Sequence, residues 1–97
     1  MENVDEYDLL QKVRNDPINY LGKINLECLY EFIKGYLYHK KPKGNNTLLY
    51  NFYDYVANHY KINTSHNWAS IINFFCNTEE EAFYKFYELL DKYIDIR

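Results

Sequence analysis

The most reactive side chains of this sequence, three histidines and two cysteines, are not spaced so as to build a reactive site. His39, His59 and His66 are isolated from one another, and neither Cys28 nor Cys76 lies near a histidine at the spacing of zinc ligands. Glycine-rich phosphate loops, G-x-S-x-G elbows and H-E-x-x-H motifs are missing from the sequence. We therefore expect free thiols, no catalytic residue, no metal site, no cofactor and no enzymatic activity.

A different kind of chemistry, recognition by charge and aromatic contact, is concentrated near the C-terminus. Each residue of an α-helix is rotated by about 100° from the previous one, so one side of a helix there would collect Glu80, Tyr84, Glu88, Asp91 and Asp95. Acidic side chains attract basic proteins, and aromatic side chains supply much of the binding energy of interfaces. We expect this side to bind a partner. An ordinary solvated helix face is the alternative interpretation.

Two further sets of residues are candidates for binding. Glu27, Glu31 and Tyr38 share the polar side of a second predicted helix and form a smaller version of the same pattern. The basic stretch from Lys34 to Lys43 supports an alternative hypothesis, in which the chain is a small regulatory or nucleic-acid-binding protein.

The charge distribution favours a basic protein as the partner. Residues 1–16 and 79–97 each carry a net charge of −3, residues 23–43 carry +3, and the whole chain is −3. An acidic total argues against general affinity for nucleic acid, which requires a basic face. The chain has no long apolar run, and its acidic start, MENVDEYDLL, lacks the basic and apolar stretches of a signal peptide. We expect a cytoplasmic protein that does not contact the membrane.

Helical patterns begin near the N-terminus. Asp5 is positioned to cap a short helix that must end before Pro17, because the residue preceding a proline disfavours helical geometry. Pro17 and Gly22 then bracket a predicted turn in which Tyr20 and Leu21 enter the core.

The next helix is predicted from Asn25, as its cap, to about Lys40. Its apolar residues recur at spacings of three and four: Leu26, Leu29, Tyr30, Ile33 and Leu37. Residues 40–46 have the composition of a surface loop.

Two helices are predicted in the following region. Thr47 is positioned to cap the first, whose apolar face comprises Leu49, Phe52, Tyr53, Val56 and Tyr60. Trp68, Ile71, Ile72 and Phe75 then follow at helical spacing and are expected in the core. Residues 71–75 would also suit a buried strand, but the spacing favours a helix.

The last helix is predicted to begin at a capping box formed by Thr78 and Glu81. Pairs at a spacing of four, Glu81 with Lys85 and Glu88 with Lys92, support it. Its predicted inner face comprises Ala82, Phe83, Phe86, Leu89, Leu90 and Tyr93. Together these patterns predict an all-α fold, a compact bundle of about five helices that forms a single domain over residues 1–97.

Several stretches of the chain together resemble the small bacterial immunity-type proteins that accompany polymorphic toxins, including those of contact-dependent growth inhibition. The stretches are Pro17-x-x-Tyr20-Leu21-Gly22, Leu26-x-x-Leu29-x-x-Phe32-Ile33-x-Gly35-Tyr36, Asn67-Trp68-x-x-Ile71-Ile72-x-Phe74, and Glu79-Glu80-Glu81-Ala82-Phe83-x-x-Phe86-x-x-Leu89-Leu90-Asp91. The resemblance implies a cytoplasmic protein that binds a cognate toxin domain, often a nuclease, and blocks it. Because binding residues in such proteins vary with the toxin, the resemblance transfers no site residue to this chain.

Overall fold

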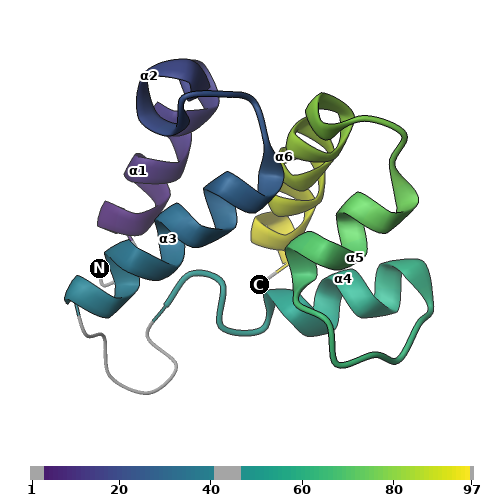
Figure 1. The fold of residues 1–97 in the computed structure, drawn as a ribbon. Helices are drawn as coiled ribbons and strands as arrows, with labels where there is room; N and C mark the ends of the chain where they lie inside the picture. Colours follow the sequence, from purple (N-terminus) through teal and green to yellow (C-terminus); the bar gives the residue numbers. More distant parts are fainter. Residues whose placement is uncertain (1–3, 41–46, 97) are drawn as a thin grey trace.

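The computed structural model of the chain describes residues 4–40 and 47–96. Within those ranges the regular elements are six helices: α1 (Val4–Asn15), α2 (Pro17–Leu21), α3 (Leu26–Lys40), α4 (Phe52–Tyr60), α5 (Trp68–Phe75) and α6 (Glu79–Ile96). Figure 1 shows α6 running between a group formed by α1, α2 and α3 and a group formed by α4 and α5. The predicted all-α bundle is therefore confirmed. The additional sixth helix is α2, which has only five residues.

Residues 17–22 form this short helix in place of the predicted turn. Pro17 occupies the first helical position, and Gly22 ends the helix at φ 83°, where its N–H donates to the carbonyl of Ile18. Leu21 packs partly buried against the core, as expected. Tyr20 exposes 40% of its surface, so its predicted place in the core was wrong. The extra turn of helix directs its ring outward, where it meets the edge of Phe32.

Three helices begin at side-chain caps. Asn25 accepts from the N–H of Cys28 at 2.9 Å, and Thr78 accepts from the N–H of Glu81 at 3.0 Å, which confirms both predicted caps. Asn67 accepts from the N–H of Ser70 at 2.8 Å and starts α5. Because residues 68–75 form this capped helix, the strand alternative is excluded.

Two other predicted caps were wrong. Asp5 lies inside the first turn of α1 and does not precede it. Helix α4 begins at Phe52, because residues 47–51 form a turn that buries Leu48 and Leu49 before the helix starts. Thr47 contributes its carbonyl to that turn, accepting from the N–H of Tyr50 at 3.3 Å.

The core is rich in aromatic rings and centres on Phe52. Its ring lies 5.3 to 5.5 Å, between centroids, from those of Trp68, Phe86 and Tyr93, in edge-to-face contacts. The whole predicted inner face of α6 is buried, and so is Trp68. Phe75 was expected in this core but exposes 42% of its surface, because α5 ends there and the ring points outward.

Two buried polar contacts attach α1 to the rest of the molecule. The hydroxyl of Tyr87 on α6 donates to the carbonyl of Leu10 at 2.6 Å, and the carboxylate of Glu6 accepts from the N–H of Leu48 at 2.8 Å. Burial raises the pKa of the Tyr87 phenol well above its ordinary value. These contacts fix the helix that borders the candidate site on α6.

No helix among residues 4–40 and 47–96 combines the length and the apolar character needed to cross a bilayer.

Candidate functional site

The five residues predicted to share one side of the last helix do so on α6. Glu80, Tyr84, Glu88, Asp91 and Asp95 are all exposed, and we refer to them as the α6 stripe. The opposite side of α6 is buried in the core, so packing against other helices holds the backbone that carries the stripe. The side chains of the stripe nevertheless differ in what they contact.

Asp91 is engaged by a residue from another helix. The guanidinium of Arg14 on α1 donates two hydrogen bonds to the Asp91 carboxylate, at 3.3 and 3.2 Å. The same guanidinium lies 5.0 Å above the centre of the Tyr87 ring. This two-pronged contact, stacked on an aromatic ring, is a geometry that arginine favours. Asp91 therefore joins α1 to α6, in addition to adding charge to the stripe.

Glu88 lies between two lysines of its own helix. Its carboxylate is 3.0 Å from the Nζ of Lys85 and 3.6 Å from that of Lys92. The hydrogen bond from Lys85 lowers the pKa of Glu88, and the same bond raises the pKa of Lys85. The predicted pair of Glu88 with Lys92 is confirmed. Lys85 pairs with Glu88 instead of Glu81, whose carboxylate accepts from the backbone N–H of Asn77 at 3.2 Å.

The two ends of the stripe carry its unpaired charges. Neither Glu80 nor Asp95 makes an ion pair within the described part of the chain. They are 15 residues apart, so a rise of 1.5 Å per residue separates them by about 22 Å along the helix. Tyr84 lies between them and exposes 48% of its surface. The stripe thus contains one exposed aromatic ring, that of Tyr84, and two acidic residues that have partners, Glu88 and Asp91. A free carboxylate lies at each end.

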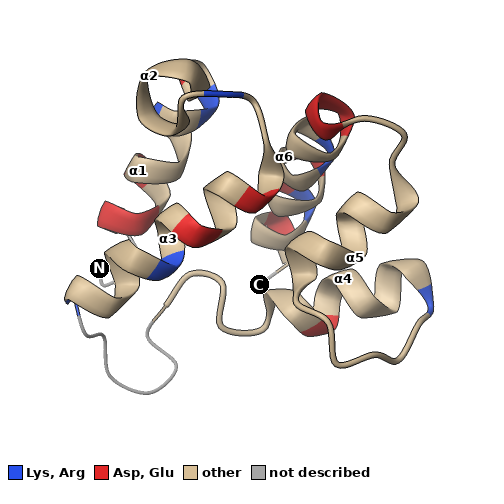
Figure 2. Cartoon of the chain, viewed as in Figure 1, with Lys and Arg blue, Asp and Glu red and all other residues tan. Residues whose placement is uncertain are grey.

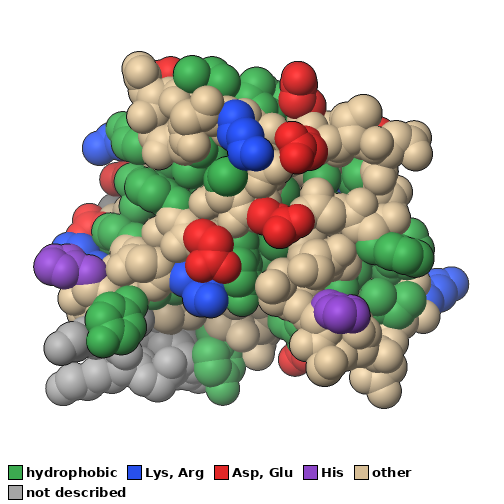
Figure 3. Space-filling view, in the orientation of Figure 1, with side chains coloured by type: hydrophobic (Ala, Val, Ile, Leu, Met, Phe, Trp, Pro, Cys, Tyr) green, Lys and Arg blue, Asp and Glu red, His purple; other side chains and the backbone are tan. Residues whose placement is uncertain are grey.

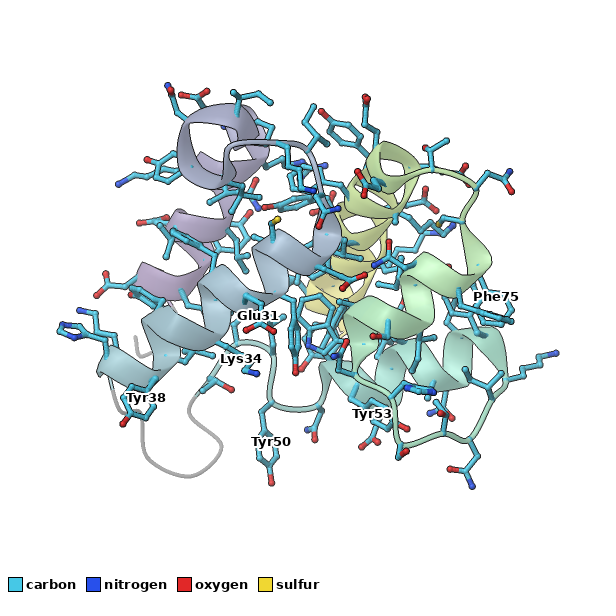
Figure 4. The ribbon with its side chains drawn as sticks, viewed as in Figure 1. Glu31, Lys34, Tyr38, Tyr50, Tyr53 and Phe75 are labelled. Carbon is cyan, nitrogen blue, oxygen red and sulfur yellow. The ribbon has the colours of Figure 1, made fainter. Side chains whose placement is uncertain are left out.

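The second predicted set lies on the outer side of α3. Tyr38 exposes 81% of its surface, and Figure 4 shows it projecting away from the helix, below Glu31 and Lys34. Glu31 is 3.8 Å from the Nζ of Lys34, and Glu27 accepts a long hydrogen bond of 3.5 Å from Asn73 on α5. Glu27, Glu31 and Tyr38 are all exposed, and they lie on a different helix from the α6 stripe.

The basic stretch is only partly visible. Lys34 and Lys40 belong to α3, where each Nζ lies over a tyrosine ring, that of Tyr30 and that of Tyr36 respectively. Lys41 and Lys43 lie outside the described residues.

The histidines and cysteines do not gather in the described ranges. No group of three or more His, Cys, Asp or Glu side chains there could hold a metal ion. Cys28 and Cys76 are free, partly buried thiols. Burial, and to a smaller extent the negative charge of Glu81, raises the pKa of Cys76. His59 has a lowered pKa because of burial and the nearby Lys85 and Lys92. Because its pKa is raised, Cys76 is a protonated thiol at neutral pH, and a thiol is less nucleophilic than a thiolate.

Sequence reasoning missed a second distinctive surface, which α4 and α5 provide. Residues 47–78 contain only two side chains of fixed charge, Asp54 and Lys61. Figures 2 and 3 show this part of the molecule as largely free of acidic and basic side chains, while charges gather over α3 and the start of α6. Phe74 on this surface exposes 80% of its area. Adjacent helical residues point about 100° apart, so the Phe74-Phe75 pair was a signal that one ring must face outward.

Comparisons of the chain with protein-family models, with curated proteins and with solved structures found no match.

Proposed function

We propose that this chain is an immunity protein that binds a basic bacterial toxin domain, such as a nuclease, and neutralises it through the α6 stripe. The proposal joins the resemblance to immunity-type proteins with the character of the exposed surface. The single observation that carries it is the exposed ring of Tyr84 between free carboxylates on a helix anchored in the core.

The arrangement suits a protein partner because it is preorganised. Helix α6 has 18 residues, and its inner face is buried along its length, so the exposed side chains stand on a fixed backbone. Binding then requires little ordering of the main chain, which lowers the entropic cost of association. Tyr84 supplies an amphipathic contact surface four residues from Glu80, and exposed aromatic residues often dominate interface energies.

The charges act at longer range. A nuclease needs cationic groups to hold the phosphates of nucleic acid, and the carboxylates of Glu80 and Asp95 are free to attract such groups. An acidic stripe of this kind speeds the encounter and competes with substrate phosphate for the same cations. Because Asp91 and Glu88 already have partners, we assign the main steering role to Glu80 and Asp95.

Charge reversal at the ends of the stripe tests the proposal. Glu80→Lys combined with Asp95→Lys should weaken binding of the toxin domain encoded by the neighbouring reading frame by about 10-fold or more, measured by calorimetry at low salt. The matched control is Asp8→Lys with Asp54→Lys, which makes the same change in net charge at exposed positions of α1 and α4. Equal affinities for the two double variants would contradict the proposed role of the stripe.

These positions are preferable to Glu88 and Asp91 for such a test. Reversing Asp91 would also break its contact with Arg14, so a loss of binding could arise from displacement of α1. A companion growth assay in cells that express the toxin measures neutralisation, and the Glu80 and Asp95 double variant should protect less well than its control.

The alternative function, nucleic-acid binding through residues 34–43, has a separate test. Filter binding of the chain to RNA and DNA at physiological salt should detect no micromolar complex, because the chain is acidic overall and Lys34 is shared with Glu31. Micromolar binding that weakens steeply with salt would favour the alternative.

A further inference from the structure

Helix α6 already binds one guanidinium, that of Arg14. This side chain comes from α1 and donates two hydrogen bonds to the Asp91 carboxylate, at 3.3 and 3.2 Å, while its guanidinium carbon lies 5.0 Å from the centre of the Tyr87 ring. Asp91 follows Tyr87 by four residues, which is about one turn of the helix. A tyrosine and an acidic residue one turn apart on α6 therefore hold a guanidinium between them.

The same combination recurs on the exposed side of α6, around Tyr84. Glu80 precedes Tyr84 by four residues, and Glu88 follows it by four. Residues four apart are neighbours on the surface of a helix. Tyr84 exposes 48% of its surface and Tyr87 only 1%, so the ring of Tyr84 can be reached from outside the molecule.

The two carboxylates beside Tyr84 differ in what they contact. Glu88 lies 3.0 Å from the Nζ of Lys85 and 3.6 Å from that of Lys92, whereas Glu80 makes no ion pair among residues 4–40 and 47–96. Side chains of a helix lean toward its N-terminus, so Tyr84 leans toward the turn that carries Glu80. A cation over the Tyr84 ring would therefore find Glu80 as its acceptor.

An open groove lies beside Glu80. It has a volume of about 430 Å³ and runs between the start of α6 and the segment that includes α2 and the connection to α3. Ile18, which exposes 55% of its surface, and the partly buried Ile24 give this groove an apolar lining. Long basic side chains lay their methylene stems on such surfaces and keep their charged ends in a polar setting.

The basic residues nearby do not cancel the charge of this site. Lys23 lines the groove with Glu80, but no ion pair joins them within the part of the chain that the structure describes. Residues 79–96 contain six acidic and two basic side chains, so the surface stays acidic even when Lys23 and Arg14 are added. The electrostatic potential there favours a cation.

We propose that Tyr84 and Glu80 bind an arginine side chain of the toxin domain, with its guanidinium stacked on the ring and hydrogen-bonded to the carboxylate. The inference rests on the proposed function and names the residue type that the toxin presents to the α6 stripe. Arginine suits the site better than lysine. Its planar guanidinium stacks on aromatic rings and donates two parallel hydrogen bonds to one carboxylate, whereas an ammonium is compact and strongly hydrated.

This arrangement also gives the stripe a way to inhibit a nuclease. Arginine is a preferred ligand of phosphate in nucleic-acid recognition. An arginine held by Tyr84 and Glu80 is withdrawn from that role, so binding at the stripe and loss of substrate binding would be the same event.

Two fluorescent peptides of equal charge, hexa-arginine and hexalysine, test the site without the toxin. Their dissociation constants for the purified chain come from anisotropy titrations at low salt. We expect hexa-arginine to bind about 5-fold more tightly, because both peptides feel the acidic surface but only a guanidinium gains the stacked contact. Tyr84→Leu should abolish this preference, and Tyr84→Phe, which keeps the ring, should retain it.

Two further variants complete the test. Tyr38→Leu removes a more exposed tyrosine from α3, 81% against 48%, and should keep the preference for arginine. Glu80→Gln should weaken hexa-arginine more than hexalysine, and it decides the matter if circular dichroism shows that Tyr84→Leu misfolds. Equal binding of the two peptides by the wild type, or a preference that survives both Tyr84→Leu and Glu80→Gln, would overturn the arginine site.

The result can be told apart from a failure of the proposed function. If the peptides bind equally while Glu80→Lys with Asp95→Lys still weakens toxin binding, the stripe binds the toxin and the arginine site is wrong. If the preference depends on Tyr84 while that double variant binds the toxin like its control, the arginine site is real and the toxin does not use it.

Discussion

The α6 stripe differs most in its charge from the apolar surface of α4 and α5, which we call the α4–α5 face and define by Tyr60, Ile62, His66, Phe74 and Phe75. Residues 79–96 contain eight acidic or basic side chains, whereas the 32 residues from 47 to 78 contain two. Both surfaces expose aromatic rings, Tyr84 on the first and Phe74 on the second. The contrast shows that aromatic content alone does not define a recognition surface. The charges around each ring decide which partner can approach it.

The two surfaces should therefore respond differently to solution conditions. The proposed binding through the stripe would depend in part on free carboxylates, which salt screens over a distance of about 10 Å at 0.1 M. Any association through the α4–α5 face would depend on removing apolar side chains from water, which salt does not weaken. Salt dependence is thus a simple way to tell which surface a given complex uses.

The largest expected effect is the difference in stability between removing a buried aromatic ring and removing an exposed one. Phe52→Ala should lower the free energy of unfolding by about 3–5 kcal/mol, because its ring contacts those of Trp68, Phe86 and Tyr93 in the core. Phe74→Ala should change it by less than about 0.5 kcal/mol. Urea unfolding of the two variants provides both values. Equal costs would mean that Phe74 is part of the core, and the α4–α5 face would lose its main feature.

A smaller effect is expected where α1 supports the stripe. Tyr87→Phe should lower the free energy of unfolding by about 1 kcal/mol at neutral pH, because the carbonyl of Leu10 loses its hydroxyl donor. Burial raises the pKa of Tyr87, so the folded chain keeps this phenol protonated when the unfolded chain ionises it, near pH 10. The stability that Tyr87 contributes is therefore complete below pH 10 and decreases above it. Wild type and variant should converge in urea unfolding at alkaline pH, and a constant difference would contradict this account.

A similar effect is expected on the other surface, where Asn67 caps α5. Asn67→Ala should cost about 1 kcal/mol, because the N–H of Ser70 loses its acceptor. Asn51→Ala is the matched control, since Asn51 precedes α4 in the same position but makes no capping hydrogen bond. Thermal unfolding of the two variants compares them directly. A lower midpoint for Asn51→Ala than for Asn67→Ala would show that α5 is not organised by this cap.

The smallest effect concerns the paired centre of the stripe. The pKa of Glu88 is lowered by Lys85, so the stability this pair contributes is present above the ordinary pKa of a glutamate and is lost as the pH falls through the lower folded value. Because the pair is exposed, Glu88→Gln should cost only about 0.2–0.5 kcal/mol at neutral pH and nothing in acid. Urea titrations at both pH values check this difference. A loss that persists in acid would point to a packing role instead.

Much of the fold could be predicted from local patterns. Asn25 and Thr78 were identified as caps because capping depends on residues three positions apart in the chain. The inner face of α6 was likewise predicted correctly, because helical period alone decides which side is apolar. Thr47 was assigned wrongly because a buried turn, with Leu48 and Leu49 in the core, has no distinct signature in the sequence.

The details of the candidate site depended on contacts between distant residues. The contact of Arg14 with Asp91 joins residues 77 positions apart, and no periodicity reveals it. Tyr87 was missed for the same reason, since its position at the margin of the inner face is buried only when α1 packs over it. Sequence reasoning could therefore place the stripe on one side of a helix, but it could not show which of its carboxylates are free.

The proposed function requires that a toxin domain binds the α6 stripe and not the α4–α5 face. The most direct test is a calorimetric titration of the toxin domain with Tyr84→Ala and Phe74→Ala in parallel, because each variant removes one exposed ring. We expect Tyr84→Ala to weaken binding by about 30-fold or more, the effect of losing an aromatic residue that dominates an interface, and Phe74→Ala to bind like the wild type. Undiminished binding by Tyr84→Ala, with the loss appearing in Phe74→Ala, would contradict the account.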